Sequence, residues 1–177
     1  YVFLGICVLS MFVGYASNPG KILALLLSIP GVLIAITFHE YAHAWTAYKL
    51  GDDTAKSQGR LSLNPLKHMD PIGIVMLLFL GFGWGRPVEI DSRNFNRNIS
   101  VRKAEAIVSI AGPLANFILA IVFSAIYGAL IKFNALTSMD TRTALTIITI
   151  LQSIISINIG LGVFNLIPLP PLDGSKV

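Results

Sequence analysis

The sequence predicts an all-α polytopic membrane protein with about four membrane helices and, between the second and third, a re-entrant segment and a short β element. Of the 177 residues, 54% are hydrophobic and only 12% charged, with a mean hydropathy of +0.73, which is unlike a soluble domain. Apolar runs of membrane length also recur along the chain. We expect residues 1–177 to be a single membrane-embedded unit and, because the chain does not begin with Met and ends soon after a motif, a fragment of a longer protein.

The first half of the chain predicts two helices joined by a turn. Residues 1–16 are apolar but lack the basic start of a signal peptide, so we interpret them as a first, incomplete membrane helix. Residues 17–20 are typical of a turn. A second helix is expected from about Lys21 to about Leu50, with a kink at Pro30.

The middle of the chain is polar and predicts shorter elements. Residues 51–70 are rich in turn formers. The apolar run Ile72–Phe82 is too short to span a bilayer, so a re-entrant or interfacial segment is expected. Arg86–Asp91 alternates in polarity and predicts a short strand that can pair with an extended peptide by edge addition.

Two further apolar runs, Ala104–Ile131 and Ala144–Ile167, predict the third and fourth helices. The third carries small or polar residues at four-residue steps, a seam suited to close helix packing. Its members are Gly112, Asn116, Ala120, Ser124 and Gly128.

Charge placement predicts the orientation in the membrane. Nine basic residues lie between positions 49 and 103, whereas the opposite helix ends carry only Lys21, Lys132 and Arg142. By the positive-inside rule, residues 49–103 face the cytoplasm, with the cell membrane as the expected location and the lipid bilayer as a partner. His39 then lies about ten residues from the cytoplasmic end of its helix, or about 15 Å into the membrane.

The H-E-x-x-H pattern of His39, Glu40 and His43 carries the chemistry. Positions four apart share a helix face, so both imidazoles can bind one metal ion, and the glutamate is placed to act as a general base on water. The preceding run Ile22–Phe38 has no charged residue, and ionisable groups beside such a run are costly enough to indicate function. A polar helix-packing cluster is the alternative interpretation.

A tetrahedral metal site needs a third protein ligand. The lone Cys7 excludes a cysteine-rich zinc site, and His68 in the polar loop is expected to be a surface residue. Asp173 is the better candidate, because the prolines at 168, 170 and 171 break the fourth helix just before it. A turn aspartate preceding Gly174 is the alternative.

Three separated motifs together resemble the site-2 protease family of intramembrane zinc metalloproteases, in its compact subgroup without an inserted peptide-binding domain. They are H-E-x-x-H at 39–43, A-G-P-L-A-N at 111–116, and N-x-x-P at 165–168 followed by L-D-G at 172–174. The loop at 64–73 also looks like that of the compact members, so the resemblance covers the chain from about residue 33 to its end. It implies that His39, His43 and Asp173 are zinc ligands and that Glu40 is the catalytic base.

Two asparagines are further candidates for the site. Asn116 lies in the small-residue seam, where it either hydrogen-bonds between helices or holds the peptide backbone and the oxyanion. Asn165 is similar, and its nearness to Asp173 in the sequence favours a role in the site.

The expected function is therefore a zinc-dependent intramembrane endopeptidase acting on transmembrane proteins, with no nucleic-acid partner. A non-proteolytic zinc carrier and an inactive scaffold that binds transmembrane helices are the alternatives. The chain shows no internal repeat of the kind common in transporters, and an inactive scaffold would not need Glu40. The sequence names neither the substrate nor the oligomeric state.

Overall fold

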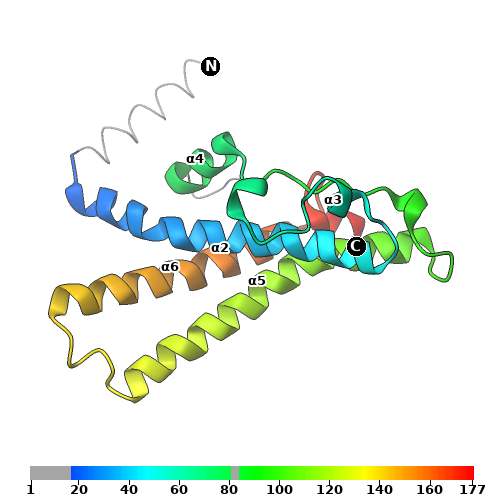
Figure 1. Cartoon of the computed structure of the whole chain (residues 1–177). Coiled ribbons are helices and arrows are strands. Elements are labelled where there is room, and N and C mark those ends of the chain that lie inside the picture. Colours follow the sequence, from blue (N-terminus) through cyan, green and yellow to red (C-terminus); the bar gives the residue numbers. More distant parts are fainter. Residues whose placement is uncertain (1–16, 81–83) are drawn as a thin grey trace.

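Three long helices form the body of the protein: α2 (Pro19–Lys49), α5 (Val101–Lys132) and α6 (Thr141–Asn165) (Figure 1). The computed structural model describes residues 17–80 and 84–177. Each of the three helices is long and apolar enough to cross a membrane. The second, third and fourth predicted helices are thus confirmed, and the predicted first helix at 1–16 lies outside the described residues.

Local sequence explains where these helices begin and end. The side chain of Asn18 accepts hydrogen bonds from the backbone N–H groups of Gly20 and Lys21, and Pro19 occupies the first turn, where its missing N–H is not needed. Gly51 follows α2 with a φ of +107°, a conformation that glycine adopts without strain. Helix α6 ends at Asn165 because Pro168 and the prolines after it cannot continue a helix.

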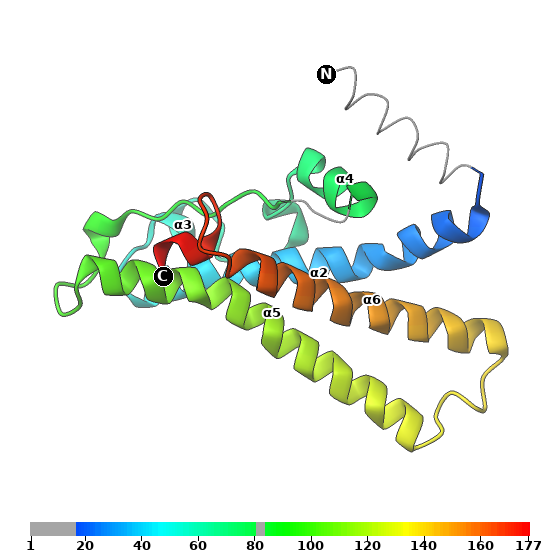
Figure 2. The same ribbon diagram turned by 180° about the vertical axis from the view of Figure 1, so that it is seen from behind.

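The helices pack closely at one end and diverge at the other. At the crossing of α2 and α6, a Cβ on Gly31 would lie 3.1 Å from the Cα of Ile154. Towards the connection between α5 and α6, the two helices separate (Figures 1 and 2). The predicted seam on α5 is therefore buried only in its first half, since Ser124 and Gly128 are exposed.

Large apolar side chains cover the outer surfaces of the long helices. On α5 these exposed residues are Leu114, Ile118, Ile121, Val122 and Ile126. A soluble protein rarely exposes so continuous an apolar surface, whereas lipid tails solvate it. The architecture is that of a membrane protein.

The region between α2 and α5 covers the second half of α2. It contains α3 (Thr54–Ser57), η1 (Pro65–Lys67), α4 (Pro71–Leu80) and η2 (Ser92–Asn94). Helix α4, in the predicted short apolar segment, lies against α2 (Figure 1). Phe95 packs with Ala47, Ala104 and Val108 in a small core that joins this region to α2 and α5.

The predicted strand at Arg86–Asp91 is not formed. Within residues 17–80 and 84–177 no strand occurs, and the only β-type pairing is an isolated bridge between Met69 and Gly85. The segment is extended, and its N–H groups bond to a loop and to side chains. The N–H of Arg86 donates to the backbone carbonyl of His68, that of Val88 to the carboxylate of Glu40, and that of Asp91 to the carboxylate of Asp52. It therefore has no need of a neighbouring strand.

Candidate metal centre and active site

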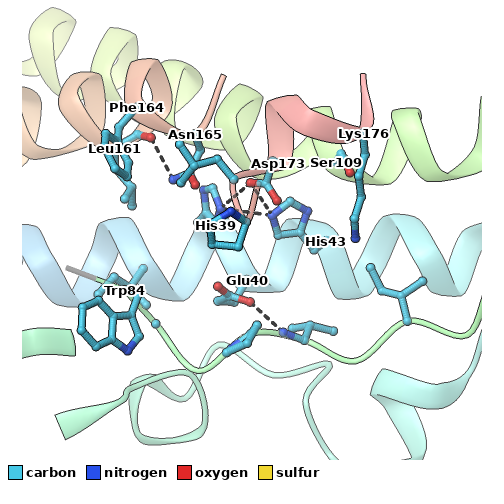
Figure 3. A pocket seen from close by; sticks show the side chains of 17 residues that line it. His39, Glu40, His43, Trp84, Ser109, Leu161, Phe164, Asn165, Asp173 and Lys176 are labelled. Carbon is cyan, nitrogen blue, oxygen red and sulfur yellow. Dashed lines mark hydrogen bonds and ion pairs between the residues drawn. The ribbon is translucent and has the colours of Figure 1, made fainter. Parts of the chain in front are cut away.

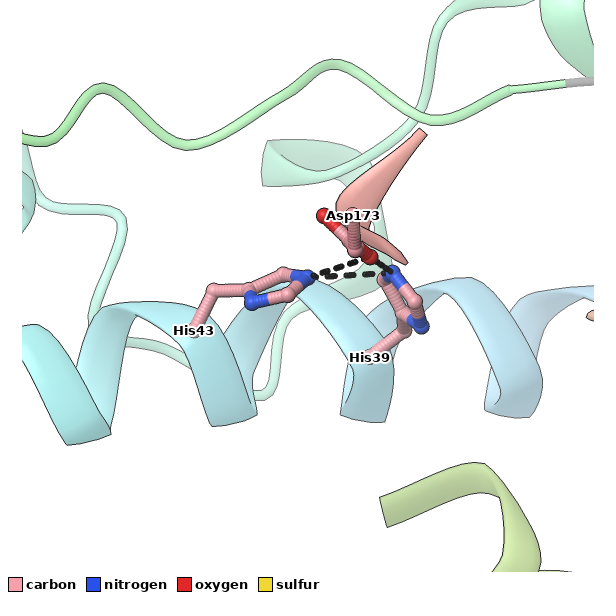
Figure 4. Close-up of side chains that lie close together, drawn as sticks. All are labelled: His39, His43 and Asp173. Carbon is pink, nitrogen blue, oxygen red and sulfur yellow. Dashed lines mark hydrogen bonds and ion pairs between the residues drawn. The ribbon is translucent and has the colours of Figure 1, made fainter. Parts of the chain in front are cut away.

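His39, His43 and Asp173 converge in space although 134 residues separate the first from the last (Figure 4). The Nε2 atoms of the two histidines are 3.1 Å apart. Asp173 Oδ2 lies 3.1 Å from Nε2 of His39 and 3.2 Å from Nε2 of His43. The third ligand predicted from the broken end of α6 is thus brought to the histidine pair.

Hydrogen bonds on the far side of each ring define which nitrogen faces this point. Nδ1 of His43 lies 2.7 Å from the backbone carbonyl of Val108, which can only accept, so in the neutral ring the proton is on Nδ1. Nδ1 of His39 lies 2.7 Å from Oδ1 of Asn116, which likewise accepts. Both Nε2 lone pairs therefore point towards the carboxylate of Asp173.

Three acceptor atoms that face one another at this distance are stabilised when a cation lies between them. Zinc with four tetrahedral ligands at about 2.0–2.1 Å would hold neighbouring ligand atoms about 3.3 Å apart, close to the separations of 3.1 to 3.2 Å seen here. Two imidazoles and one carboxylate are also the donor set of catalytic zinc sites, which keep a fourth position for water or substrate. The three residues fit a catalytic metal.

The third helix comes unusually close to these rings at Gly112. A Cβ at this position would lie 2.6 Å from Cε1 of His43 and 2.7 Å from Cε1 of His39, which is inside contact distance. Only glycine lets α5 approach the two imidazoles in this way. The sequence identified Gly112 as a packing position but gave no sign that it borders the metal centre.

Glu40 lies beside the histidines and is almost fully buried, at 8% exposure. Its carboxylate points towards the extended segment, where Oε2 accepts a hydrogen bond of 3.0 Å from the N–H of Val88 (Figure 3). Arg60 holds the same segment, because its guanidinium donates to the carbonyls of Arg86 and Pro87. The contacts to Val88 and from Arg60 could not be predicted, since they depend on how two loops fold over α2.

A cavity of about 500 Å³ connects Glu40 with the two histidines and Asp173 (Figure 3). The side chains of Ile36, Trp84, Leu161 and Phe164 give it largely apolar walls. An apolar cavity with a few polar groups at one point is typical of a site that binds an apolar substrate segment.

The two candidate asparagines have different surroundings. Asn116 is fully buried and contacts Nδ1 of His39, on the side of the ring away from Asp173. Asn165 lines the cavity, and its amide donates to the carbonyl of Leu161 in its own helix.

Asn158 is a third buried asparagine, which the sequence did not single out. It is fully buried and accepts a hydrogen bond from Asn116. Its amide side chain within an apolar helix was the feature of the sequence that could have identified it.

The expectation that His68 is a surface residue is wrong. The side chain has 0% exposure, and its Nε2 lies 2.6 Å from the carbonyl oxygen of Ser62. Burial lowers the pKa of His68 below its usual value, which favours the neutral ring. It is not among the residues that converge on the metal centre. The turn-forming residues around His68 predicted an exposed loop, but the loop folds so that the imidazole is enclosed.

Comparisons with known proteins identify the family of the chain. Residues 27–177 match peptidase family M50. The chain is 43% identical over 152 residues to "Putative zinc metalloprotease YwhC" of Bacillus subtilis, covering 82% of this chain and 64% of YwhC. It is 31% identical to "Putative zinc metalloprotease Rip2" of Mycolicibacterium smegmatis, covering 84% of this chain and 54% of Rip2. The chain thus spans between half and two thirds of the length of these relatives. No solved structure matches it.

Proposed function

Since the chain belongs to peptidase family M50, the zinc-dependent site-2 protease family, we propose that it is an intramembrane endopeptidase that hydrolyses peptide bonds in or near transmembrane segments of membrane proteins. One observation carries the proposal. Two histidine nitrogens and a carboxylate oxygen converge within 3.2 Å, and a buried glutamate shares their cavity.

His39, His43 and Asp173 are the proposed zinc ligands. When bound there, zinc would supply the Lewis acidity that polarises a scissile carbonyl and makes water a nucleophile near neutral pH. The protein's part is to present two neutral imidazoles in the correct tautomer, which Asn116 and the carbonyl of Val108 achieve.

Glu40 is the proposed general base and acid. The N–H of Val88 holds its Oε2, which leaves Oε1 to take a proton from water and pass it to the leaving amine. Asn165 is proposed to contact the substrate, because it lines the cavity beside Asp173. For Asn116, the contact with His39 favours support of a ligand over direct binding of the oxyanion.

The substrate is proposed to be a transmembrane protein that unwinds locally within the cavity. An amide inside a helix is shielded by its own hydrogen bonds, so the attacked segment must be extended. The apolar walls of the cavity suit apolar side chains on either side of the bond.

The proposed location is the cell membrane, with the loop-rich end of the bundle towards the cytoplasm. The nine basic residues between positions 49 and 103 lie at this end or in the loops beside it. Water and the freed polypeptide would then pass through the polar loops next to Glu40.

The purified protein and its Glu40→Gln variant test the function, with Glu105→Gln as a control for loss of a glutamate elsewhere. Each is assayed for zinc content and for cleavage of a peptide with one transmembrane segment. We expect similar zinc in all three and a loss of at least about 100-fold in cleavage only for Glu40→Gln. Cleavage that survives Glu40→Gln would overturn the mechanism. Zinc bound by all three, with zinc uptake into vesicles and no cleavage, would support a carrier.

A further inference from the structure

Asn158 of α6 is an amide that the proposed chemistry does not use. It has 0% exposure and lies in an apolar helix, where a polar group is retained only if it is hydrogen-bonded. Its Nδ2 donates to the carbonyl of Ile154 at 2.8 Å, and its Oδ1 accepts from Nδ2 of Asn116 at 2.9 Å. Asn158 therefore joins α6 to the residue that touches His39.

The direction of these hydrogen bonds is set by two backbone carbonyls, which can only accept. The carbonyl of Ile154 requires the Nδ2 side of Asn158, which turns its Oδ1 towards Asn116. The carbonyl of Ala35, 3.1 Å away, requires the Nδ2 side of Asn116. Both hydrogens of the Asn116 amide are thus engaged, and its Oδ1 is left to accept from Nδ1 of His39.

The two histidines are supported in different ways. His43 donates to a backbone carbonyl within α5, whose position is fixed by the helix. His39 donates to a side chain that can rotate, so its tautomer and orientation depend on what holds that side chain. Asn158 supplies one of the two bonds that stop the Asn116 amide from turning over.

We propose that Asn158 is a positioning residue that acts through Asn116 to keep the lone pair of His39 Nε2 directed at the metal. The inference rests on the proposed function, because it takes the convergence point of His39, His43 and Asp173 to be a metal site. The proposed hydrogen-bonded chain runs from Asn158 of α6 through Asn116 of α5 to His39 of α2, so each of the three long helices contributes one residue.

Metal affinity of the full chain tests the proposal without reference to cleavage. The metal-free protein is titrated with Co²⁺, whose visible absorption reports ligand geometry, and Zn²⁺ affinity is measured by competition. Removing an outer hydrogen bond to a ligating histidine typically weakens metal binding 10- to 100-fold. We expect about a ten-fold loss and an altered Co²⁺ spectrum for Asn158→Leu.

Three further variants separate positioning from general packing. Asn158→Asp places a carboxyl group in a fully buried apolar site, which favours its protonated form. That form accepts from Asn116 and donates its O–H to the carbonyl of Ile154, so its metal affinity should stay within about two-fold of the wild type, well short of the ten-fold loss expected for a broken outer bond. If Asn158→Leu does not fold, Asn158→Asp still tests whether the acceptor oxygen at this position is sufficient for metal binding. Adding Asn158→Leu to Asn116→Leu should cause no further loss, because the relay is already broken. Ser153→Ala removes a different polar contact of α6, to the carbonyl of Leu27, and should leave the spectrum unchanged.

The outcomes are distinct. Wild-type affinity and spectrum in Asn158→Leu would overturn the positioning role while leaving the metal centre intact. Full additivity with Asn116→Leu, or equal losses in Asn158→Asp and Asn158→Leu, would also overturn it. A wild-type protein that binds neither Co²⁺ nor Zn²⁺ would overturn the proposed function itself.

Discussion

Gly112 is the residue at which the absence of a Cβ leaves room for the two histidines of the candidate metal centre. Helix α5 lies against both imidazoles there, and a Cβ would come within 2.7 Å of each ring. The rings cannot move aside freely, since each is hydrogen-bonded through Nδ1. A methyl group should therefore displace the ligands rather than be absorbed by the packing.

We predict that Gly112→Ala loses most of its zinc, with affinity falling at least about ten-fold, the loss typical when a metal ligand's support is disturbed. Gly128→Ala is the matched control, because Gly128 is on the same helix and faces open space. That control should keep its zinc and gain up to about 1 kcal/mol in helix stability. Zinc per chain and thermal unfolding measure both effects. Full zinc in Gly112→Ala would contradict the geometry.

The three candidate metal ligands that converge could be picked out from the sequence, whereas the residues that contact them from other helices could not. His39 and His43 are related by local helical spacing, and the prolines before Asp173 indicate broken helix at depth. Asn158 and Gly112 act through contacts between helices, and single-sequence patterns do not reveal which faces meet. His68 was misjudged for the same reason, because its burial depends on tertiary packing of the loop.

The extended segment Arg86–Asp91 is the element that most determines the surroundings of Glu40. Asp52 anchors its far end: Oδ2 accepts from the N–H of Asp91 at 2.9 Å. Oδ1 accepts from the backbone and hydroxyl of Thr54 and from the amide of Asn94. Burial works to raise the pKa of Asp52, but these hydrogen bonds outweigh it and hold the pKa below its usual value.

We predict that Asp52→Asn lowers the free energy of unfolding by about 1–3 kcal/mol, because its amide must turn two donors towards the N–H of Asp91. Zinc content should not change, since Asp52 is not among the proposed metal ligands. Asp53→Asn, at the exposed neighbouring position, is the control. Thermal unfolding in detergent measures the difference.

The effect has a defined dependence on pH. A carboxyl whose pKa is lowered by folding stabilises the protein above its unfolded pKa of about 3.9, and this contribution is lost as the pH falls through the folded value. The gap between wild type and Asp52→Asn should therefore be widest near neutral pH and shrink below about pH 4. An equal gap at every pH would contradict the role assigned to the charge.

At the level of elements, the helices were predictable and the strand was not. Long apolar runs with caps and prolines at their ends define α2, α5 and α6 to within a few residues. The alternation at Arg86–Asp91 correctly indicates extended backbone, but alternation does not tell whether the partner is another strand or a set of side chains. A proline at position 88 would remove the N–H that donates to Glu40. A loss of cleavage in Val88→Pro would therefore be explained by the change at Glu40, without any pairing between this segment and an extended substrate.

The whole molecule places its chemistry where the three helices are still in contact. After α6 ends, the chain turns and leads into η3 (Asp173–Lys176) (Figure 2), whose first residue lies within 3.2 Å of both histidines. Helix α2 continues for ten residues beyond His39, or about 15 Å. If Lys49 marks the membrane surface, as the sequence predicts, His39 lies about half of a hydrocarbon core deep.

This arrangement has a consequence for where a substrate is cut. The loops over α2 contact Glu40 through the N–H of Val88, so we expect water to enter the site from the loop-rich end. The outer faces of the helices are apolar and would meet lipid. A transmembrane substrate should thus be cleaved inside its apolar segment or at its border, on the side of the loops.

Mass-spectrometric mapping of the bond cleaved in a transmembrane protein, reconstituted with this protein in lipid vesicles, tests the account most directly. We predict a new terminus within or at the edge of the substrate's apolar segment, absent when Glu40→Gln replaces the wild type. Cleavage confined to regions well outside the membrane, or an identical product from Glu40→Gln, would contradict an intramembrane protease built on this site.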